Sequence, residues 1–175
     1  EIAAAGHEIG HHGWVHENPV RLTPEQERDV LQRGLTVLEE TTGTRPVGYR
    51  SPAWDISPAT IPLLIEHGFL YDSSLMGDDF SPYWARVGDR WTQDGPVAWH
   101  LDDFPYFEYV RNAQGGVLPG NASPERLEFI WTEEFAYLRE DVGAGLMTLT
   151  MHPQVIGRGH RIRALDRMIR HFKSY

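Results

Sequence analysis

The chain of 175 residues has a formal net charge of −9 at pH 7, 41% hydrophobic residues and no cysteine. This length and composition are typical of one globular domain, and the acidic balance argues against nucleic acid or an anionic membrane as a partner, since both need clustered Lys and Arg. No apolar stretch approaches the roughly 20 residues that span a bilayer, and without thiolates any metal must be bound by His, Asp or Glu. We expect a small neutral or cationic partner and a reducing, cytoplasmic location.

Residues 1–5 read as the last turn of a helix whose start precedes Glu1. We therefore expect residues 1–175 to form a single domain whose N-terminal part lies outside this sequence.

Helix boundaries are predicted in chain order from capping residues. Thr23 is placed to cap a first helix that starts at Pro24, Gln26 completes a capping box, and Gly43 ends the run. The same pattern predicts helices over residues 57–68 and 123–143, and a last helix covers residues 161–172.

Short apolar runs alternate with these helices at residues 7–11, 46–50, 68–72 and 145–152. Strand alternating with helix predicts an α/β fold with parallel strands, whose carboxyl ends share one face. Each run is followed by reactive or polar residues, so four clusters are expected to converge on one rim. Residues 76–120 break the rhythm and are predicted to form a long loop with one strand at residues 97–101.

Four of the nine histidines fall in the stretch "GHEIGHHGWVHE", residues 6–17. His12 and His16 are spaced i, i+4 beyond the end of a predicted strand, where two imidazoles can bind a divalent metal together with a carboxylate. His7 and His11 have the same spacing, but the strand pattern could point them into the core. The other interpretation of all four is surface or hydrogen-bonded core histidines.

Two further residues follow predicted strands. Arg50, in "GYRSPAW", can hold a carboxylate through two parallel hydrogen bonds, or it can form a surface ion pair. His152, in "LMTLTMH", can act as a general acid or base, or it can be a capping or core histidine.

Four tryptophans, Trp14, Trp54, Trp84 and Trp99, lie in or near the loops expected at the active face. Aromatic faces at a rim suit sugar rings, although packing in the core is the usual place for Trp.

Together these motifs resemble the polysaccharide deacetylase family, the NodB-homology domain of carbohydrate esterase family 4, over most of the chain. The resemblance implies a distorted (β/α) barrel and a divalent metal, commonly zinc, that hydrolyses N-acetyl groups on chitin-like or peptidoglycan sugars. "HHGWVH" is similar to the family's histidine motif, which implies that His12 and His16 are the metal ligands and places Trp14 at the substrate.

The remaining motifs imply further roles. "RSPAW" resembles the Arg-x-Pro motif, so Arg50 would orient the catalytic base and Trp54 would form a wall of the groove. "YDSS" implies that Asp72 and Ser74 line the groove, and "TMHP" implies that His152 is the general acid that protonates the departing amine.

The family's Asp-Asp pair, which supplies the base and the third metal ligand, has no counterpart ahead of "GHEIGHH". We expect the missing pair, with the N-terminal strand or strands of the barrel, to precede this chain. Asp102 and Asp103, in "WHLDDFPYF", could substitute for that pair or could shape the substrate groove.

The phrases "HGWVHENP", "RSPAWDIS" and "SPYWARVGD" resemble an intracellular branch that includes peptidoglycan deacetylases, allantoinase-like proteins and cyclic-imide hydrolases. The resemblance predicts a metal-dependent hydrolase of non-peptide C–N bonds, acting on an N-acetylated sugar or polysaccharide. The alternatives are a cyclic-imide or allantoin-type amidohydrolase and a non-catalytic carbohydrate-binding relative. The aromatic run "SPYWARVGDRW" could line the groove or form a contact in a homo-oligomer.

Overall fold

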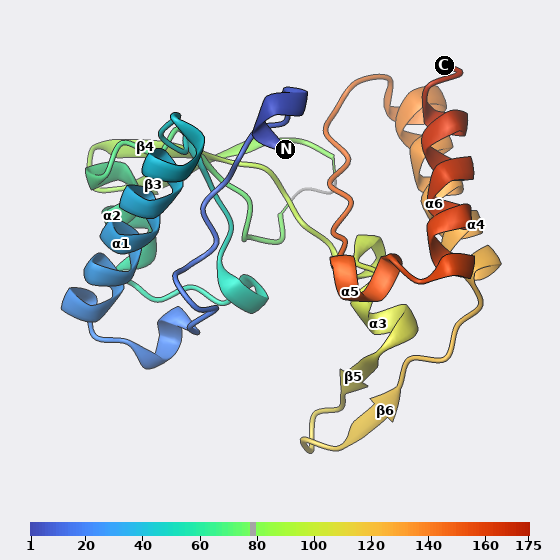
Figure 1. Ribbon diagram of the computed structural model, residues 1–175, viewed down its shortest axis with the longest axis horizontal. Coiled ribbons are helices and arrows are strands. Elements are labelled where there is room, and N and C mark those ends of the chain that lie inside the picture. The colour runs from blue at the N-terminus through green and yellow to red at the C-terminus, as the bar shows by residue number, and fades with distance from the viewer. Residues whose placement is uncertain (78–79) are drawn as a thin grey trace. The chain divides into compact units, whose positions relative to one another are not determined.

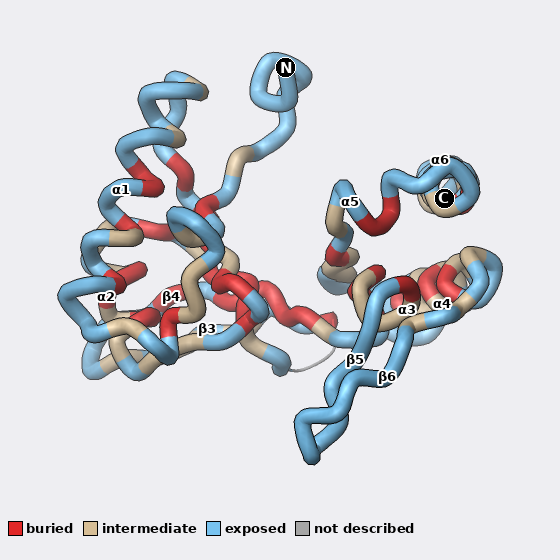
Figure 2. Tube along the Cα trace, turned by 60° about the horizontal axis from the view of Figure 1, so that its bottom comes forward, coloured by how far each residue is buried: buried red, intermediate tan, exposed pale blue. Residues whose placement is uncertain are grey.

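The computed structural model describes residues 1–77 and 80–175. The chain divides into two compact units, Glu1–Pro96 and Val97–Tyr175 (Figure 1), and each is described by itself. Buried residues form a separate cluster in each unit (Figure 2). The expectation of a single domain over residues 1–175 stays a prediction.

The first unit contains a four-stranded sheet of order β1-β2-β4-β3, in which β1, β2 and β4 are parallel and β3 is antiparallel to β4. Its elements are α1 (Pro24–Thr42), β1 (Gly48–Tyr49), α2 (Thr60–Glu66), β2 (Tyr71–Asp72), β3 (Tyr83–Val87) and β4 (Arg90–Asp94), with 3₁₀ turns at Ala3–Ala5, Pro19–Arg21 and Pro52–Trp54. His11 continues the parallel ladder beside Tyr49, since its backbone N–H donates to the Gly48 carbonyl at 2.8 Å. Helices between parallel strands confirm the predicted α/β class.

The local signals that predict α1 are confirmed. The Thr23 hydroxyl accepts from the Gln26 backbone at 3.3 Å and the Gln26 side chain accepts from the Thr23 backbone at 2.9 Å, which is the expected capping box. Gly43 ends the helix with φ +75°, a conformation that costs glycine little. The helix buries Leu31 and Leu35 in the core of the unit.

α2 begins later than its sequence predicts, at Thr60 rather than directly after Ser57. The Ser57 hydroxyl donates to Glu27, a buried carboxylate on α1, at 2.6 Å, and the Thr60 hydroxyl donates to the same carboxylate. These bonds hold residues 57–60 as a turn and satisfy Glu27, which would otherwise be a costly unpaired charge.

The second unit consists of α3 (Phe104–Phe107), β5 (Tyr109–Arg111), β6 (Val117–Pro119), α4 (Pro124–Tyr137), α5 (Pro153–Ile156) and α6 (Gly159–Phe172), with a π turn at Leu138–Val142. α4 and α6 lie side by side (Figure 1) and bury Leu127, Trp131 and Met168. Both helices are confirmed, and α6 begins two residues before its predicted start at residue 161.

The predicted strand at residues 97–101 is wrong, because Trp99–Leu101 form a 3₁₀ turn. The His100 carbonyl accepts hydrogen bonds from the Trp131 indole at 3.1 Å and the Tyr106 hydroxyl at 2.9 Å. These contacts with distant side chains take the place of the strand-to-strand hydrogen bonds expected for residues 97–101. The predicted strand at residues 145–152 is reduced to one position in the described structure. Thr150 forms a parallel β bridge with Asp102.

The predicted long loop at residues 76–120 is also wrong, since β3, β4, α3, β5 and β6 lie within it. β3 and β4 are joined by the two-residue turn Gly88–Asp89, with Gly88 at φ +60°, as short hairpins require.

Among the described residues, no helix has both the length and the apolar character to cross a membrane.

Candidate metal and catalytic centre

Three predicted clusters meet at the carboxyl ends of the parallel strands in the first unit. His12 follows the bridging residue His11, Arg50 follows β1 and Ser73 follows β2. His12 Nδ1 lies 2.7 Å from the Arg50 carbonyl, and the Arg50 guanidinium donates to the Ser73 carbonyl and hydroxyl at 2.9 and 2.7 Å. The predicted convergence is confirmed for these clusters. The fourth, around His152, belongs to the second unit.

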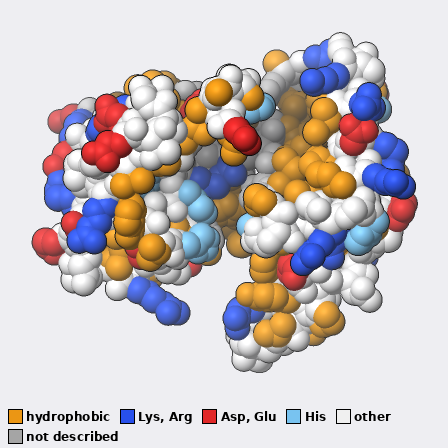
Figure 3. Space-filling view, in the orientation of Figure 1, with side chains coloured by type: hydrophobic (Ala, Val, Ile, Leu, Met, Phe, Trp, Pro, Cys, Tyr) orange, Lys and Arg blue, Asp and Glu red, His pale blue; other side chains and the backbone are white. Residues whose placement is uncertain are grey.

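His12 and His16 form an exposed imidazole pair, and histidine side chains are visible as a patch on the first unit in Figure 3. Their ring centroids are 5.1 Å apart and the ring planes are nearly perpendicular. A carbonyl only accepts hydrogen bonds, so His12 Nδ1 carries the proton and the lone pair lies on Nε2. Among the described residues, no third His, Asp or Glu groups with this pair, and its role as metal ligands stays a prediction.

His11 has a different role from its neighbours, as the strand pattern allowed. It is 1% exposed, its Nε2 lies 3.1 Å from the Leu31 carbonyl and its Nδ1 accepts from the Gly13 backbone at 3.2 Å. Burial lowers the pKa of His11 to about 4, so it is a neutral core residue at physiological pH. His7 is exposed.

Backbone strain is concentrated near the candidate ligands. His16, Ala53 and Trp54 have φ angles of 67°, 56° and 60°, in the left-handed region that L residues rarely adopt. Ala53 and Trp54 follow Arg50 in the Arg-x-Pro motif. Such strain is typical of residues whose position is set by function.

The residues predicted to line the groove differ in exposure. Trp14 is 44% exposed, whereas Trp54, Asp72 and Ser74 are buried. The Ser74 hydroxyl donates to Asp72 at 2.6 Å and accepts from the Ser51 backbone at 2.8 Å. Asp72 and Ser74 therefore hold the Arg-x-Pro segment in place, and their contact with substrate stays a prediction.

A buried carboxyl pair accompanies this network. Asp72 on β2 is in register with Asp94 on β4, and neither side chain is exposed. Burial and the neighbouring Asp72 raise the pKa of Asp94 to about 8, and burial also raises the pKa of Asp72. Among the described residues, Asp72 Oδ2 and both Asp94 oxygens have no hydrogen-bond donor, and a proton shared between the two carboxyls would satisfy one oxygen of each. Asp94 was not among the predicted site residues, because in the sequence it is one acidic residue of a polar segment.

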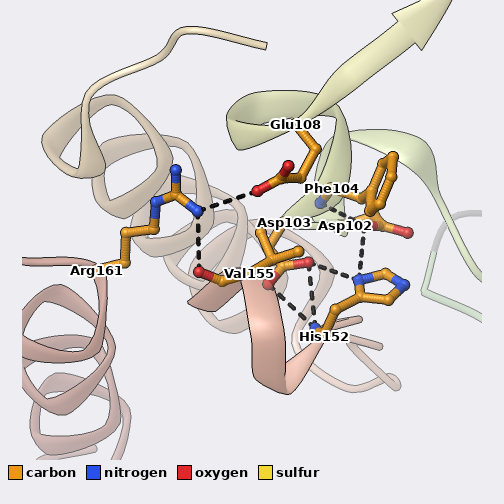
Figure 4. Close-up of polar contacts among 7 residues, drawn as sticks. All are labelled: Asp102, Asp103, Phe104, Glu108, His152, Val155 and Arg161. Carbon is orange, nitrogen blue, oxygen red and sulfur yellow. Dashed lines mark hydrogen bonds and ion pairs between the residues drawn. The ribbon is translucent and has the colours of Figure 1, made fainter. Parts of the chain in front are cut away.

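The second unit pairs His152 with Asp103 (Figure 4). His152 Nδ1 lies 2.7 Å from Asp103, and the same carboxylate accepts from the His152 backbone at 3.1 and 3.2 Å. Asp103 is fully buried, while a third of the His152 side chain is exposed. The carboxylate thus fixes the imidazole with its proton on Nδ1 and its lone pair on Nε2.

The β bridge between Asp102 and Thr150 explains why Asp103 meets His152, because each follows a bridged position on a parallel segment. Both residues follow apolar runs in the sequence, but nothing local indicates that these two runs pair. Asp102 accepts from the Phe104 backbone at 2.7 Å, and with Asp103 and His152 it forms a group whose ligand atoms lie within 4.8 Å of one another. This geometry could hold a metal ion, although Asp103 already accepts three N–H contacts from His152.

Neighbouring contacts hold the His152 segment. Arg161, at the start of α6, donates to the Val155 carbonyl at 2.9 Å and pairs with Glu108 at 3.4 Å (Figure 4). Its guanidinium also lies 4.3 Å from the centre of the Phe107 ring. α5, which follows His152 directly, is thereby tied to both α3 and α6.

Comparison with known proteins places this arrangement in a family. The sequence profile described as polysaccharide deacetylase matches residues 1–71. A peptidoglycan deacetylase of Helicobacter pylori is 32% identical over 197 aligned positions, which cover 99% of this chain and 67% of that protein. The chain belongs to the polysaccharide deacetylase family.

Solved structures agree with this family assignment. A Mycobacterium smegmatis protein assigned as a polysaccharide deacetylase is 43% identical, with a TM-score of 0.85 over 97% of this chain and 58% of that one. The allantoinase PuuE is 29% identical, with a TM-score of 0.80 over 99% of this chain and 55% of that one. These similarities confirm the predicted relation to the deacetylases and allantoinase-like proteins. They also confirm the predicted fold class, the distorted (β/α) barrel of that family. The chain spans little more than half of these two structures.

Proposed function

We propose that the protein containing this chain is a metal-dependent hydrolase that removes acetyl groups from N-acetylated sugars of a peptidoglycan-like glycan. The observation that carries the proposal is the Asp103–His152 pair, a half-buried imidazole oriented by a fully buried carboxylate. The similarity to a peptidoglycan deacetylase over nearly the whole chain supports this choice of substrate.

The donor set in the first unit fits a divalent metal such as zinc. His12 and His16 are exposed and close to one another, and the chain has no cysteine that could bind the metal in their place. The Arg50 carbonyl fixes the tautomer of His12. When bound, the metal would lower the pKa of water and polarise the acetyl carbonyl. Among the described residues, no carboxylate groups with the two histidines as a third ligand or as the catalytic base.

His152 would protonate the departing sugar nitrogen from Nε2 after gaining a proton there. Asp103 would stabilise the resulting imidazolium, because its negative charge lies 2.7 Å from Nδ1. Arg50, whose guanidinium is held by its hydrogen bond to the Ser73 carbonyl, would orient the catalytic base. The exposed Trp14 would stack on a sugar ring.

A cyclic-imide or allantoin-type hydrolase remains the second candidate, supported by the similarity to PuuE. Opening a cyclic amide needs the same proton donor and the same polarised carbonyl, so the described residues serve either reaction.

The test is to incubate the protein containing this chain, loaded with zinc, with N-acetylglucosamine oligomers, peptidoglycan fragments, allantoin and cyclic imides. We expect acetate release from the N-acetylated glycans and no ring opening. Ring opening without acetate release would establish the second candidate, and activity on neither class would support a binding relative.

A further inference from the structure

The loop Gly13–Glu17 connects the two candidate metal ligands and is closed by its own last side chain. Glu17 Oε2 accepts the backbone N–H groups of Trp14 and Val15, each at 3.0 Å. Hydrogen bonds from backbone amides to a carboxylate are among the stronger ones in proteins. Glu17 therefore fixes the backbone between His12 and His16.

The loop is built around that carboxylate. Gly13 has φ +76°, and a Cβ there would lie 3.2 Å from Glu17 Oε2 and 3.1 Å from the Pro52 ring. Glycine is thus the residue that admits the carboxylate at this distance. After the loop, Asn18 donates to Asp55 at 2.5 Å, which anchors the chain on its other side.

The two histidines are held differently. His12 is oriented by its hydrogen bond to the Arg50 carbonyl. The His16 ring contacts His12 and, within the described residues, makes no hydrogen bond. The position of His16 therefore depends on its backbone, which has the unfavourable φ of 67° and lies directly beside Glu17.

We propose that Glu17 is a positioning residue, whose carboxylate holds His16 opposite His12 and so sets the affinity of the pair for a divalent metal without binding that metal. The inference rests on the proposed function in requiring a metal at His12 and His16. It assigns Glu17 to the loop rather than to the metal, since Oε2 accepts two backbone amides and, among the described residues, Glu17 does not group with His12 and His16 as a set of metal ligands.

The test is a Zn²⁺ titration of the metal-free protein against a chromophoric chelator, for the wild type, Glu17→Ala, Glu17→Gln and the control Glu40→Ala on the exposed face of α1. Removing a residue that orients a ligand costs about 10- to 100-fold in metal affinity, and we expect that loss for Glu17→Ala. Glu17→Gln keeps an oxygen that can accept both amides, so it recovers most of the loss. Glu40→Ala has wild-type affinity.

Amide hydrogen exchange of Trp14 and Val15 in the metal-free variants provides a readout that does not depend on metal. We expect faster exchange at both amides in Glu17→Ala and wild-type exchange in Glu17→Gln. Wild-type zinc affinity in Glu17→Ala, or unchanged exchange, would overturn the inference. Loss of affinity in Glu17→Gln with wild-type exchange would also overturn it, by making Glu17 a ligand. A wild type that binds no zinc would instead refute the proposed metal site, and the exchange data would still decide whether Glu17 closes the loop.

Discussion

Replacing Asp94 by Asn should remove a large pH dependence of stability. The pKa of Asp94 is raised to about 8 by burial and by Asp72, whereas an unfolded Asp has a pKa of about 3.9. Between these values the folded chain holds a proton that the unfolded chain releases, so the free energy of unfolding falls as pH rises. One proton corresponds to about 1.4 kcal/mol per pH unit, or about 3 kcal/mol between pH 5 and pH 7.

In Asp94→Asn the side-chain amide donates permanently to Asp72, and this part of the slope disappears. The assay is urea unfolding at several pH values from 5 to 9, with Asp89→Asn as the control because Asp89 is exposed on the same hairpin. We expect the stability difference between Asp94→Asn and the wild type to change by about 3 kcal/mol between pH 5 and pH 7 and to level off above about pH 8. Parallel curves for the two proteins would refute the shared proton.

Other substitutions test separate parts of the structure. His152→Ala should retain metal but reduce turnover by about 10²- to 10⁴-fold, and wild-type rates would remove its role as the acid. Gly34→Ala should lower the free energy of unfolding by about 1–3 kcal/mol, because its Cβ would lie 2.1 Å from His11 Nε2; a stabilised variant in urea unfolding would contradict this packing. Ala53→Gly should raise the free energy of unfolding by up to about 1 kcal/mol through relief of its positive φ, and a loss of stability would show that the conformation is not strained.

The parts of the fold that local chemistry determines were predictable. α1 follows from Thr23, Gln26 and Gly43, all within or next to the helix they define. The meeting of His12 and Arg50 followed from the rule that parallel strands present their carboxyl ends at one edge.

The errors arose where distant contacts override local preference. Residues 97–101 have the composition of a strand, yet Trp131 and Tyr106 bind the His100 carbonyl and the chain forms a turn. Asp94 was missed because an acidic residue in a polar segment gives no sign that it will be buried beside Asp72. The pairing of Asp103 with His152 depends on a bridge between segments 48 residues apart, which no local pattern reveals.

The most direct test of the account is the metal content of the protein containing this chain, measured by elemental mass spectrometry for the wild type and His12→Ala. We expect near-stoichiometric zinc or another divalent metal in the wild type and its loss in His12→Ala, with circular dichroism unchanged. Equal metal content in the two proteins would show that His12 is not a ligand. An absence of metal in the wild type after reconstitution would contradict the proposed metal-dependent hydrolase.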